Sequence, residues 1–381
     1  MTTGKDFTGS DLAGGRLTID LAALVANWRH LARLAGSAEC GAVVKANAYG
    51  CGIERVVEAL EHAGCKTFFV ALPEEGLRAR AIAPNARIFV LNGIFSNAVP
   101  HFLDANLIPI LGSVPEVECW SDAAKIAERP LPCALHFDSG MNRLGLLPRE
   151  LQRLAADKAT MDRFDLQLFM THYACADDVG HPKTALQREV FLQHAELVPG
   201  VAQSTANSAA ILQADGHGFD LARPGIALYG GEALNDAPNP MQPVVKLEGR
   251  IIQIKKAMKG ESVGYGGAET LTRDSRLAYL SVGYADGYPR AASNMGVPMR
   301  AVSTAARAAH KGQILKGVGR VSMDMMAFDV TDVPETDIAP GDWLELFGPT
   351  IPVDDVARAA GTIGYELLTG LGNRYSREYV R

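Results

Sequence analysis

Short apolar runs alternate eight times with segments of helical period between residues 16 and 240 of this 381-residue chain. The intervening segments include Val56, Val57 and Leu60, an apolar stripe typical of a helix that packs on a sheet. Eight βα units predict a (β/α)8 barrel over residues 16–242. A doubly wound sheet has the same alternation, but no G-x-G-x-x-G motif opens the first helix. The expected strands are 42–46, 67–72, 87–92, 107–111, 132–138, 166–173, 201–207 and 222–229.

The alternation stops near residue 245, and β-rich segments with two short helices follow. This change predicts a second, mostly antiparallel β domain over residues 243–381. Residues 1–15 form an N-terminal tail that could add a strand to it. The expected strands are 244–254, 277–284, 296–302, 318–330 and 343–347, and the expected helices are 353–360 and 365–371.

Composition excludes several classes of protein. The net charge of -6 offers no basic surface to nucleic acid or to an anionic membrane. No apolar stretch reaches membrane-spanning length, and the N-terminus lacks the pattern of a secretory signal, so we expect a cytoplasmic protein. Six scattered cysteines without a C-x-x-C pair indicate reduced thiols rather than disulfides or a metal site.

Polar residues stand at or just after the carboxyl ends of the expected barrel strands, which a barrel brings to one rim. Each of them alone could simply cap a strand. Lys45 is the most informative, because an amine between an apolar strand and a small-residue turn can be desolvated and can form a Schiff base. The set comprises Lys45, Asn92, His136, Asp138, His172, Asn207, Ser208 and Arg223.

Six motifs occur in order along nearly the whole chain. They are VKANAYG at 44–50, DSGMNRLG at 138–145, THYA at 171–174, RPGIALYG at 223–230, VGYADGY at 282–288 and VSMDM at 321–325. Together they resemble the bacterial alanine racemases, which are pyridoxal-phosphate enzymes with a barrel and a β domain. The resemblance implies a head-to-tail homodimer acting on alanine.

Racemisation requires the Cα proton to leave one face and return to the other, so two acid/base groups must flank the substrate. The resemblance implies that Lys45 first holds pyridoxal phosphate as a Schiff base and then acts as the base for D-alanine. Tyr265 would serve the opposite face and L-alanine. Tyr265 and Met323 are expected to come from the partner subunit.

The resemblance also implies the binding residues. Arg223 would face the cofactor's ring nitrogen, with His172 holding Arg223 through a hydrogen bond. Arg143 and the Met323 N–H would bind the substrate carboxylate, and Asp324 would orient local groups. The cofactor's phosphate would be held by Tyr49, Ser208, Gly225 and Ile226, and Asn207 would also bind the cofactor.

The sequence departs from the family pattern at two points. His136 stands where some members carry a carbamylated lysine, so the histidine or an anion would supply the contact to Arg143. The C-terminal tyrosine that contacts the phosphate has Asn373 at its aligned position. We leave that contact unassigned.

Three other functions remain open from the sequence. A broader-specificity or serine racemase would share these motifs, because discriminating a methyl from a hydroxymethyl group takes only about 1–3 kcal/mol. A pyridoxal-phosphate decarboxylase is less favoured because it needs a cysteine in the β domain, and the last cysteine is Cys175. A single-barrel pyridoxal-phosphate homeostasis protein would lack residues 245–381. The biosynthetic or catabolic role of a racemase is also open.

Overall fold

The structure is a computed structural model, and it describes residues 12–213, 220–293 and 306–381. The chain divides into two compact units. One unit is Leu24–Gln242, and the other joins the N-terminal segment up to Ala23 with Pro243–Arg381.

The first unit is a parallel barrel. Its strands follow one another in sequence order from β3 to β9, and β10 pairs in parallel with β2. The Arg223 N–H donates to the Ala206 carbonyl at 2.9 Å, which joins the last strand to β9 and closes the ring. The predicted barrel is confirmed. Its strands are β2 (Glu39–Cys40), β3 (Ala42–Val43), β4 (Thr67–Val70), β5 (Arg87–Val90), β6 (Ile108–Leu111), β7 (Leu131–His136), β8 (Phe164–Met170), β9 (Gln203–Ser204) and β10 (Leu221–Ala222).

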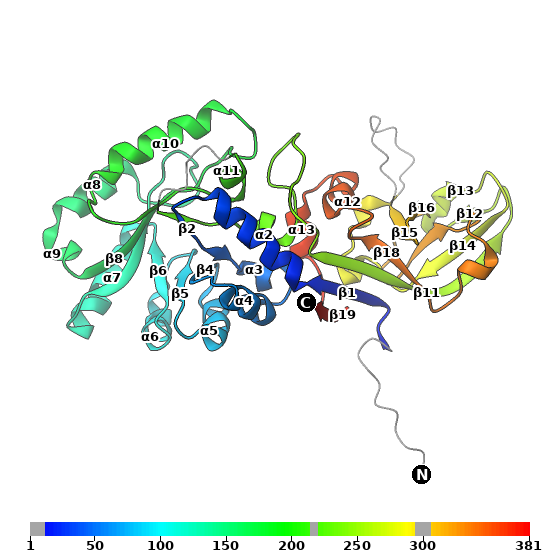
Figure 1. Ribbon diagram of the computed structural model, residues 1–381, viewed down its shortest axis with the longest axis horizontal. Coiled ribbons are helices and arrows are strands. Elements are labelled where there is room, and N and C mark those ends of the chain that lie inside the picture. Colours follow the sequence, from blue (N-terminus) through cyan, green and yellow to red (C-terminus); the bar gives the residue numbers. More distant parts are fainter. Residues whose placement is uncertain (1–11, 214–219, 294–305) are drawn as a thin grey trace, which may run out of the picture. The chain divides into compact units, whose positions relative to one another are not determined.

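Helices lie around the outside of the parallel strands (Figure 1). In α4, Ile53, Val56, Val57 and Leu60 are fully buried, as the predicted stripe requires. The larger helices are α2 (Leu21–Leu34), α4 (Ile53–His62), α5 (Pro73–Ile82), α6 (Val99–Asp104), α7 (Val114–Ala127), α8 (Pro148–Ala156) and α10 (Pro182–Ala195). The short helices are α3 (Lys45–Tyr49), α9 (Lys158–Met161) and α11 (Ser208–Leu212).

The second unit is built on an eight-stranded sheet in the order β14-β17-β16-β15-β18-β11-β1-β19. An additional pairing of β14 with β11 closes six of these strands into a ring. All of the pairings are antiparallel except that of β1 with β19, so the predicted antiparallel domain is confirmed. The strands are β1 (Gly15–Asp20), β11 (Val245–Ala257), β14 (Ser275–Leu280), β15 (Arg307–His310), β16 (Gln313–Val318), β17 (Met326–Asp329), β18 (Trp343–Phe347) and β19 (Ser376–Val380).

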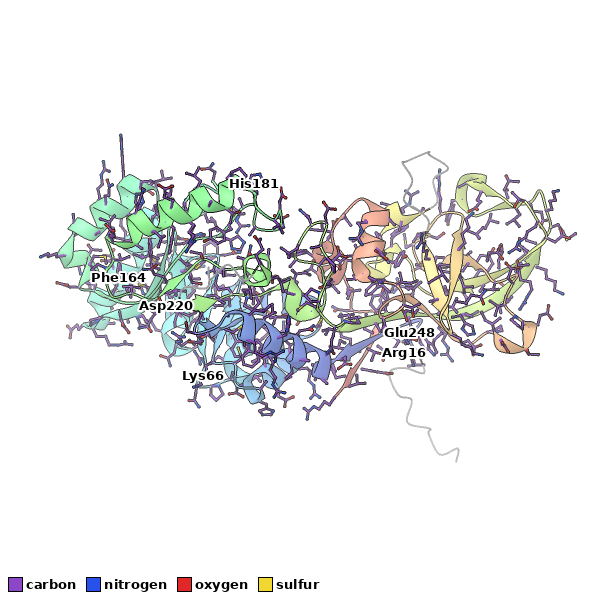
Figure 2. The ribbon with its side chains drawn as sticks, turned by 45° about the horizontal axis from the view of Figure 1, so that its top comes forward. Arg16, Lys66, Phe164, His181, Asp220 and Glu248 are labelled. Atoms are coloured by element: carbon purple, nitrogen blue, oxygen red, sulfur yellow. The ribbon has the colours of Figure 1, made fainter. Side chains whose placement is uncertain are left out.

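The N-terminal segment that belongs to the β unit is longer than the predicted 15 residues. Alternate residues Leu17 and Ile19 are fully buried, and β1 pairs with both β11 and β19. Arg16 donates two hydrogen bonds to Glu248 at 2.9 and 2.7 Å, and Figure 2 labels both residues. The first boundary therefore follows Ala23 rather than residue 15.

Two of the predicted strands differ from the structure in detail. The run 222–229 is a strand only to Ala222, and Ile226–Tyr229 form a buried 3-10 turn. The run 318–330 is broken between β16 and β17 by a loop that carries Met323. The predicted strand 296–302 lies outside the described residues. The two predicted helices appear as α12 (Val353–Ala360) and α13 (Gly364–Thr369).

Within the described part of the chain, every helix is too short or too polar to traverse a lipid bilayer. All six cysteines are free thiols.

Candidate active site

Lys45 lies just beyond the carboxyl end of β3, at the start of an unusual turn. The four residues from Ala46 to Tyr49 all have φ between 51° and 54°, which makes one left-handed helical turn without a glycine. This conformation costs roughly 1–2 kcal/mol per residue for L-amino acids, so other parts of the fold must hold it in place.

Two side chains stabilise this turn. The buried Glu75 carboxylate accepts hydrogen bonds from Asn47 N–H at 3.3 Å and from Ala71 N–H at 2.8 Å. The Asn47 side-chain oxygen accepts from Ile53 N–H at 3.1 Å and from Arg78 at 2.8 Å. Sequence reasoning missed Glu75, because an acidic residue in the first turn of a helix usually serves only that helix.

The barrel rim gathers basic groups that perturb one another. Burial lowers the pKa of the Lys45 amine, and the positive charge of Arg143 lowers it further, partly offset by Glu75. Burial, Arg223 and Arg143 lower the pKa of His136 to about 4. Burial and the same two arginines hold the pKa of His172 well below its usual range. Both histidines are therefore neutral at neutral pH, and the remaining positive charges favour an anionic ligand.

Arg223 is buried and fixed by two acceptors. Its Nη2 donates to the Thr171 carbonyl at 2.7 Å, and its Nη1 donates to the Ser204 hydroxyl. The expectation that His172 holds Arg223 is wrong: no hydrogen bond joins them among the described residues, and these two groups occupy that role. Desolvation lowers the pKa of Arg223 to about 10, so it stays protonated at neutral pH.

Tyr49, Ser208 and Gly225 form a small cup just after β10. The Ser208 hydroxyl accepts from the Gly225 N–H at 2.8 Å and from the Ala227 N–H at 3.4 Å. A Cβ at Gly225 would lie 2.5 Å from the Tyr49 hydroxyl oxygen, so only glycine allows these two segments of the chain to approach this closely.

Neighbouring groups hold the cup in shape. The Tyr49 ring stacks on Tyr229 at 4.6 Å, and the Tyr229 hydroxyl donates to the Val43 carbonyl at 2.9 Å. The Asn207 side chain caps α11 by accepting from Ala210 N–H at 3.0 Å. Ile226 is buried at the start of the 3-10 turn that follows Gly225. Hydroxyl and backbone N–H groups around a glycine are the donors that a bound phosphate uses.

Arg143 is exposed on a loop that Asp138 shapes. One Asp138 oxygen accepts from the N–H groups of Gly140 at 2.9 Å, Met141 at 2.9 Å and Asn142 at 3.1 Å. Among the described residues, the Arg143 guanidinium has no hydrogen bond or ion pair, so its planar fork can bind a carboxylate. His136 is buried at the end of the strand that leads into this loop.

The remaining predicted residues belong to the β unit. Tyr265 is 72% exposed, between Gly264 and Gly266, which both have positive φ. Arg320 lies beneath this turn, with its Nη1 3.6 Å from the position of a Cβ at Gly266. Met323 is 53% exposed, and Asp324 pairs with Arg374 at 2.8 Å.

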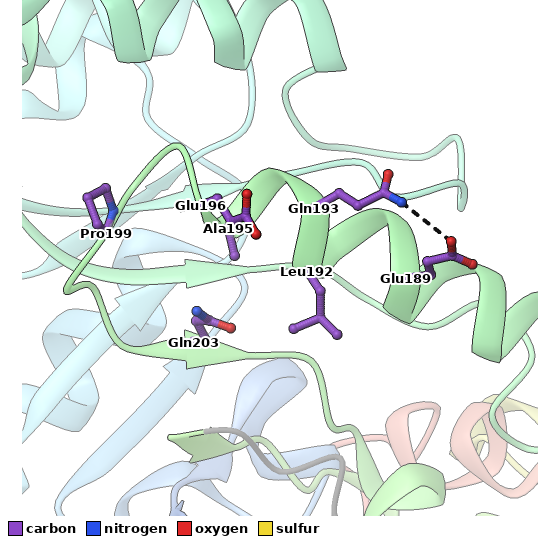
Figure 3. A pocket seen from close by; sticks show the side chains of 7 residues that line it. All are labelled: Glu189, Leu192, Gln193, Ala195, Glu196, Pro199 and Gln203. Carbon is purple, nitrogen blue, oxygen red and sulfur yellow. Dashed lines mark hydrogen bonds between the residues drawn. The ribbon is translucent and has the colours of Figure 1, made fainter.

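An open pocket of about 490 Å³ lies elsewhere on the barrel unit, between α10 and the chain that leads into β9 (Figure 3). It shares no residue with the predicted site, and its Glu189 carboxylate already accepts from Gln193 at 3.4 Å. We therefore place the chemistry at the strand ends. The pocket is lined by Glu189, Leu192, Gln193, Ala195, Glu196, Pro199 and Gln203.

A lysine of lowered pKa, a buried arginine and a cup of hydroxyl and N–H groups at one barrel rim are typical of the barrel enzymes that bind a phosphorylated aldehyde cofactor. Sequence profiles identify the family within that class. The profile of the alanine racemase N-terminal domain matches residues 19–233, and that of the C-terminal domain matches residues 244–379. The chain belongs to the alanine racemase family.

Individual relatives agree over nearly the full length. The chain is 50% identical over 367 residues to the biosynthetic alanine racemase of Agrobacterium fabrum, covering 96% of this chain and 93% of that one. It is 41% identical over 384 residues to the catabolic alanine racemase of Mesorhizobium japonicum, covering 100% and 98%.

Solved structures share the fold. Alanine racemase from Bartonella henselae, with covalently bound pyridoxal phosphate, superposes with a TM-score of 0.89 at 38% identity, covering 97% of this chain and 100% of that one. The biosynthetic alanine racemase of Pseudomonas aeruginosa gives 0.88 at 37% identity, again covering 97% and 100%.

Proposed function

We propose that this chain interconverts L-alanine and D-alanine, with pyridoxal phosphate held covalently by Lys45. The observation that carries the proposal is the Lys45 amine itself. Its pKa is lowered by burial and by Arg143, and it sits in a turn that Glu75 holds rigidly at the barrel rim. A neutral amine is the form that attacks an aldehyde and accepts a proton.

The barrel residues fit this cofactor. Tyr49, Ser208, Gly225 and Ile226 would hold its phosphate, with Asn207 ordering α11 beside them. Arg223, fixed by Thr171 and Ser204, would donate to the ring nitrogen, since a guanidinium has no acceptor. When bound, pyridoxal phosphate delocalises the negative charge that remains on Cα after its proton leaves.

Proton transfer falls to two residues. Lys45 would take the Cα proton of D-alanine, and the Tyr265 hydroxyl would take that of L-alanine from the opposite face. Arg143 and the Met323 N–H would bind the substrate carboxylate. His136 stays neutral beside Arg143, as its pKa of about 4 requires, and so leaves the positive charge of Arg143 to the substrate.

We also propose that the enzyme is a head-to-tail homodimer in which Tyr265 and Met323 complete the partner's site. The exposed fractions of 72% for Tyr265 and 53% for Met323 support this assembly, because a general base works in a site from which water is excluded. The cytoplasmic location expected from the sequence stays a prediction.

The direct test is a panel of L-amino acids assayed for D-product. L-alanine should give D-alanine, and rapid conversion of L-serine would indicate the broader-specificity alternative. The variant Lys45→Ala should lose racemisation by on the order of 10⁴-fold or more. Lys66→Ala, which removes an exposed lysine labelled in Figure 2, is the matched control and should retain full activity. A Lys45→Ala protein that still racemises alanine would contradict the proposal.

A further inference from the structure

The loop that carries Met323 is fixed by a neighbouring turn, η4 (Tyr284–Asp286). The Tyr284 N–H donates to the Ser322 carbonyl at 3.0 Å, and the Ala285 N–H donates to the Met323 carbonyl at 3.0 Å. In a trans peptide the N–H points opposite to the C=O. The bond to Ser322 therefore turns the Met323 N–H away from η4, and this N–H has no partner among the described residues.

The turn and the loop lie unusually close together. A Cβ at Gly283 would lie 2.3 Å from the Met323 carbonyl oxygen and 2.4 Å from that of Ser322. Only glycine allows this approach, and Asp286 holds the glycine by accepting from its N–H at 2.8 Å. The direction of the Met323 N–H thus depends on how firmly Asp286 and the loop are held relative to each other.

Arg374 bridges the two segments. Its Nε pairs with Asp286 Oδ1 at 2.9 Å, and its Nη1 pairs with Asp324 Oδ1 at 2.8 Å. The Asp286 side chain is only 4% exposed, whereas those of Arg374 and Asp324 are 51% and 53% exposed. Gly372 N–H also donates to the Asp286 carbonyl at 3.0 Å, which anchors the segment that carries Arg374.

The charges agree with this geometry. The hydrogen bond to Asp324 and the charge of Asp286 raise the pKa of Arg374, so the guanidinium keeps its positive charge. An exposed ion pair contributes little to the global stability of a protein. Its effect is therefore expected on local geometry more than on folding.

We propose that Arg374 is a positioning residue for the substrate carboxylate: by joining Asp286 to Asp324 it holds the Met323 N–H in the direction of the carboxylate. The inference rests on the proposed function, because it presumes that the Met323 N–H binds alanine. Arg374 acts through the loop and touches no reacting atom.

The test compares Arg374→Gln with Arg273→Gln. Arg273 is a matched control, because it is 47% exposed in the same unit and bridges two aspartates, Asp329 and Asp332, at 3.1 and 2.7 Å. In Arg374→Gln the KM for both alanine enantiomers should rise about tenfold, the effect of one weakened hydrogen bond to a charged group, with kcat changed less than about threefold. Arg273→Gln should leave both constants unchanged.

A binding measurement separates positioning from a general loss of structure. Propanoate, which is alanine without its amino group, should bind the Arg374→Gln holoprotein about tenfold more weakly by calorimetry, with the thermal unfolding midpoint nearly that of the unaltered protein. Arg374→Lys keeps the charge but not the planar fork, so it should give an intermediate affinity.

The outcomes are distinguishable. If unaltered protein racemises alanine and Arg374→Gln has unchanged KM and propanoate affinity, the role of Arg374 is overturned and the proposed function stands. If Arg374→Gln and Arg273→Gln weaken propanoate equally, the bridge has no special role, which also overturns the inference. A wild-type protein without racemase activity overturns the proposed function itself.

Discussion

The barrel rim and the exposed face of the β unit hold complementary halves of the proposed chemistry, and they differ in how complete they are. At the rim, Lys45, Arg223 and His172 have pKa values shifted by burial, and Arg223 and the cup are tied by hydrogen bonds within the same unit. On the β unit, Tyr265 and Met323 are largely exposed.

This difference indicates that the two regions have separate roles. The rim is preorganised for a cofactor, because hydrogen bonds within the barrel unit hold the left-handed turn and the buried arginine. In the proposed dimer, the β unit instead presents a tyrosine and a free N–H whose surroundings another subunit would supply. The cofactor site would then form in each chain, and catalysis would require two.

After Lys45→Ala, the largest expected effect is that of Tyr265→Phe, which sharpens the roles of the two bases. Tyr265→Phe removes only a hydroxyl on the exposed face of the β unit. Racemisation should therefore fall by on the order of 10³-fold while cofactor absorbance is retained. Lys45 remains, so D-alanine should still exchange its Cα proton with deuterated solvent, and L-alanine should not. Equal exchange of both enantiomers, read by NMR, would remove Tyr265 from the mechanism.

A second prediction concerns His136, which is buried at the barrel rim. In the unfolded chain a histidine binds a proton below pH about 6.5, whereas folded His136 stays neutral down to about 4. The unfolded state therefore binds more protons in this window, and stability should fall as the pH drops through it, by about 3 kcal/mol at most.

Chemical denaturation at pH 7 and at pH 4.5 can measure this pH-dependent loss of folding stability. His136→Gln should lose less stability between the two pH values than the unaltered protein, and the other titrating groups cancel in the comparison. An identical loss in both proteins would mean that His136 is already solvated or already protonated.

The smallest expected effect tests the cup. Gly225→Ala would push a Cβ against the Tyr49 hydroxyl, so pyridoxal phosphate should bind about tenfold more weakly, as expected for one displaced hydrogen bond to a charged group. Pyridoxal without the phosphate is the matched control, and its affinity should not change. Equal weakening of both ligands would place the phosphate elsewhere.

The sequence predicted the barrel, the β domain and the position of Lys45, because strand period and strand-end polarity are local signals. It did not predict the left-handed turn after Lys45. Nothing in K-A-N-A-Y demands positive φ, and the conformation is stabilised in part by Glu75, which lies 28 residues from Asn47 in sequence. Such tertiary contacts leave no periodic trace.

Contacts between residues distant in sequence also explain the other differences between the predicted and the observed structure. The sequence could not identify Ser204 and Thr171 as the partners of Arg223, since strands that are distant in sequence bring them together. The apolar run 222–229 has the composition of a strand, but the close approach of Gly225 to Tyr49 turns the chain into a 3-10 turn. The bridge from Arg374 to Asp286 and Asp324 likewise joins residues that are far apart in sequence.

Subunit complementation tests the division between rim and β unit most directly. Lys45→Ala and Tyr265→Phe chains, each inactive alone, are mixed, unfolded and refolded together with pyridoxal phosphate. If Tyr265 acts in the partner's site, each mixed dimer has one site with both bases intact, and the mixture should recover roughly a quarter of the unaltered activity. A mixture as inactive as either variant alone would show that both bases act within one chain, and would contradict the proposed dimer.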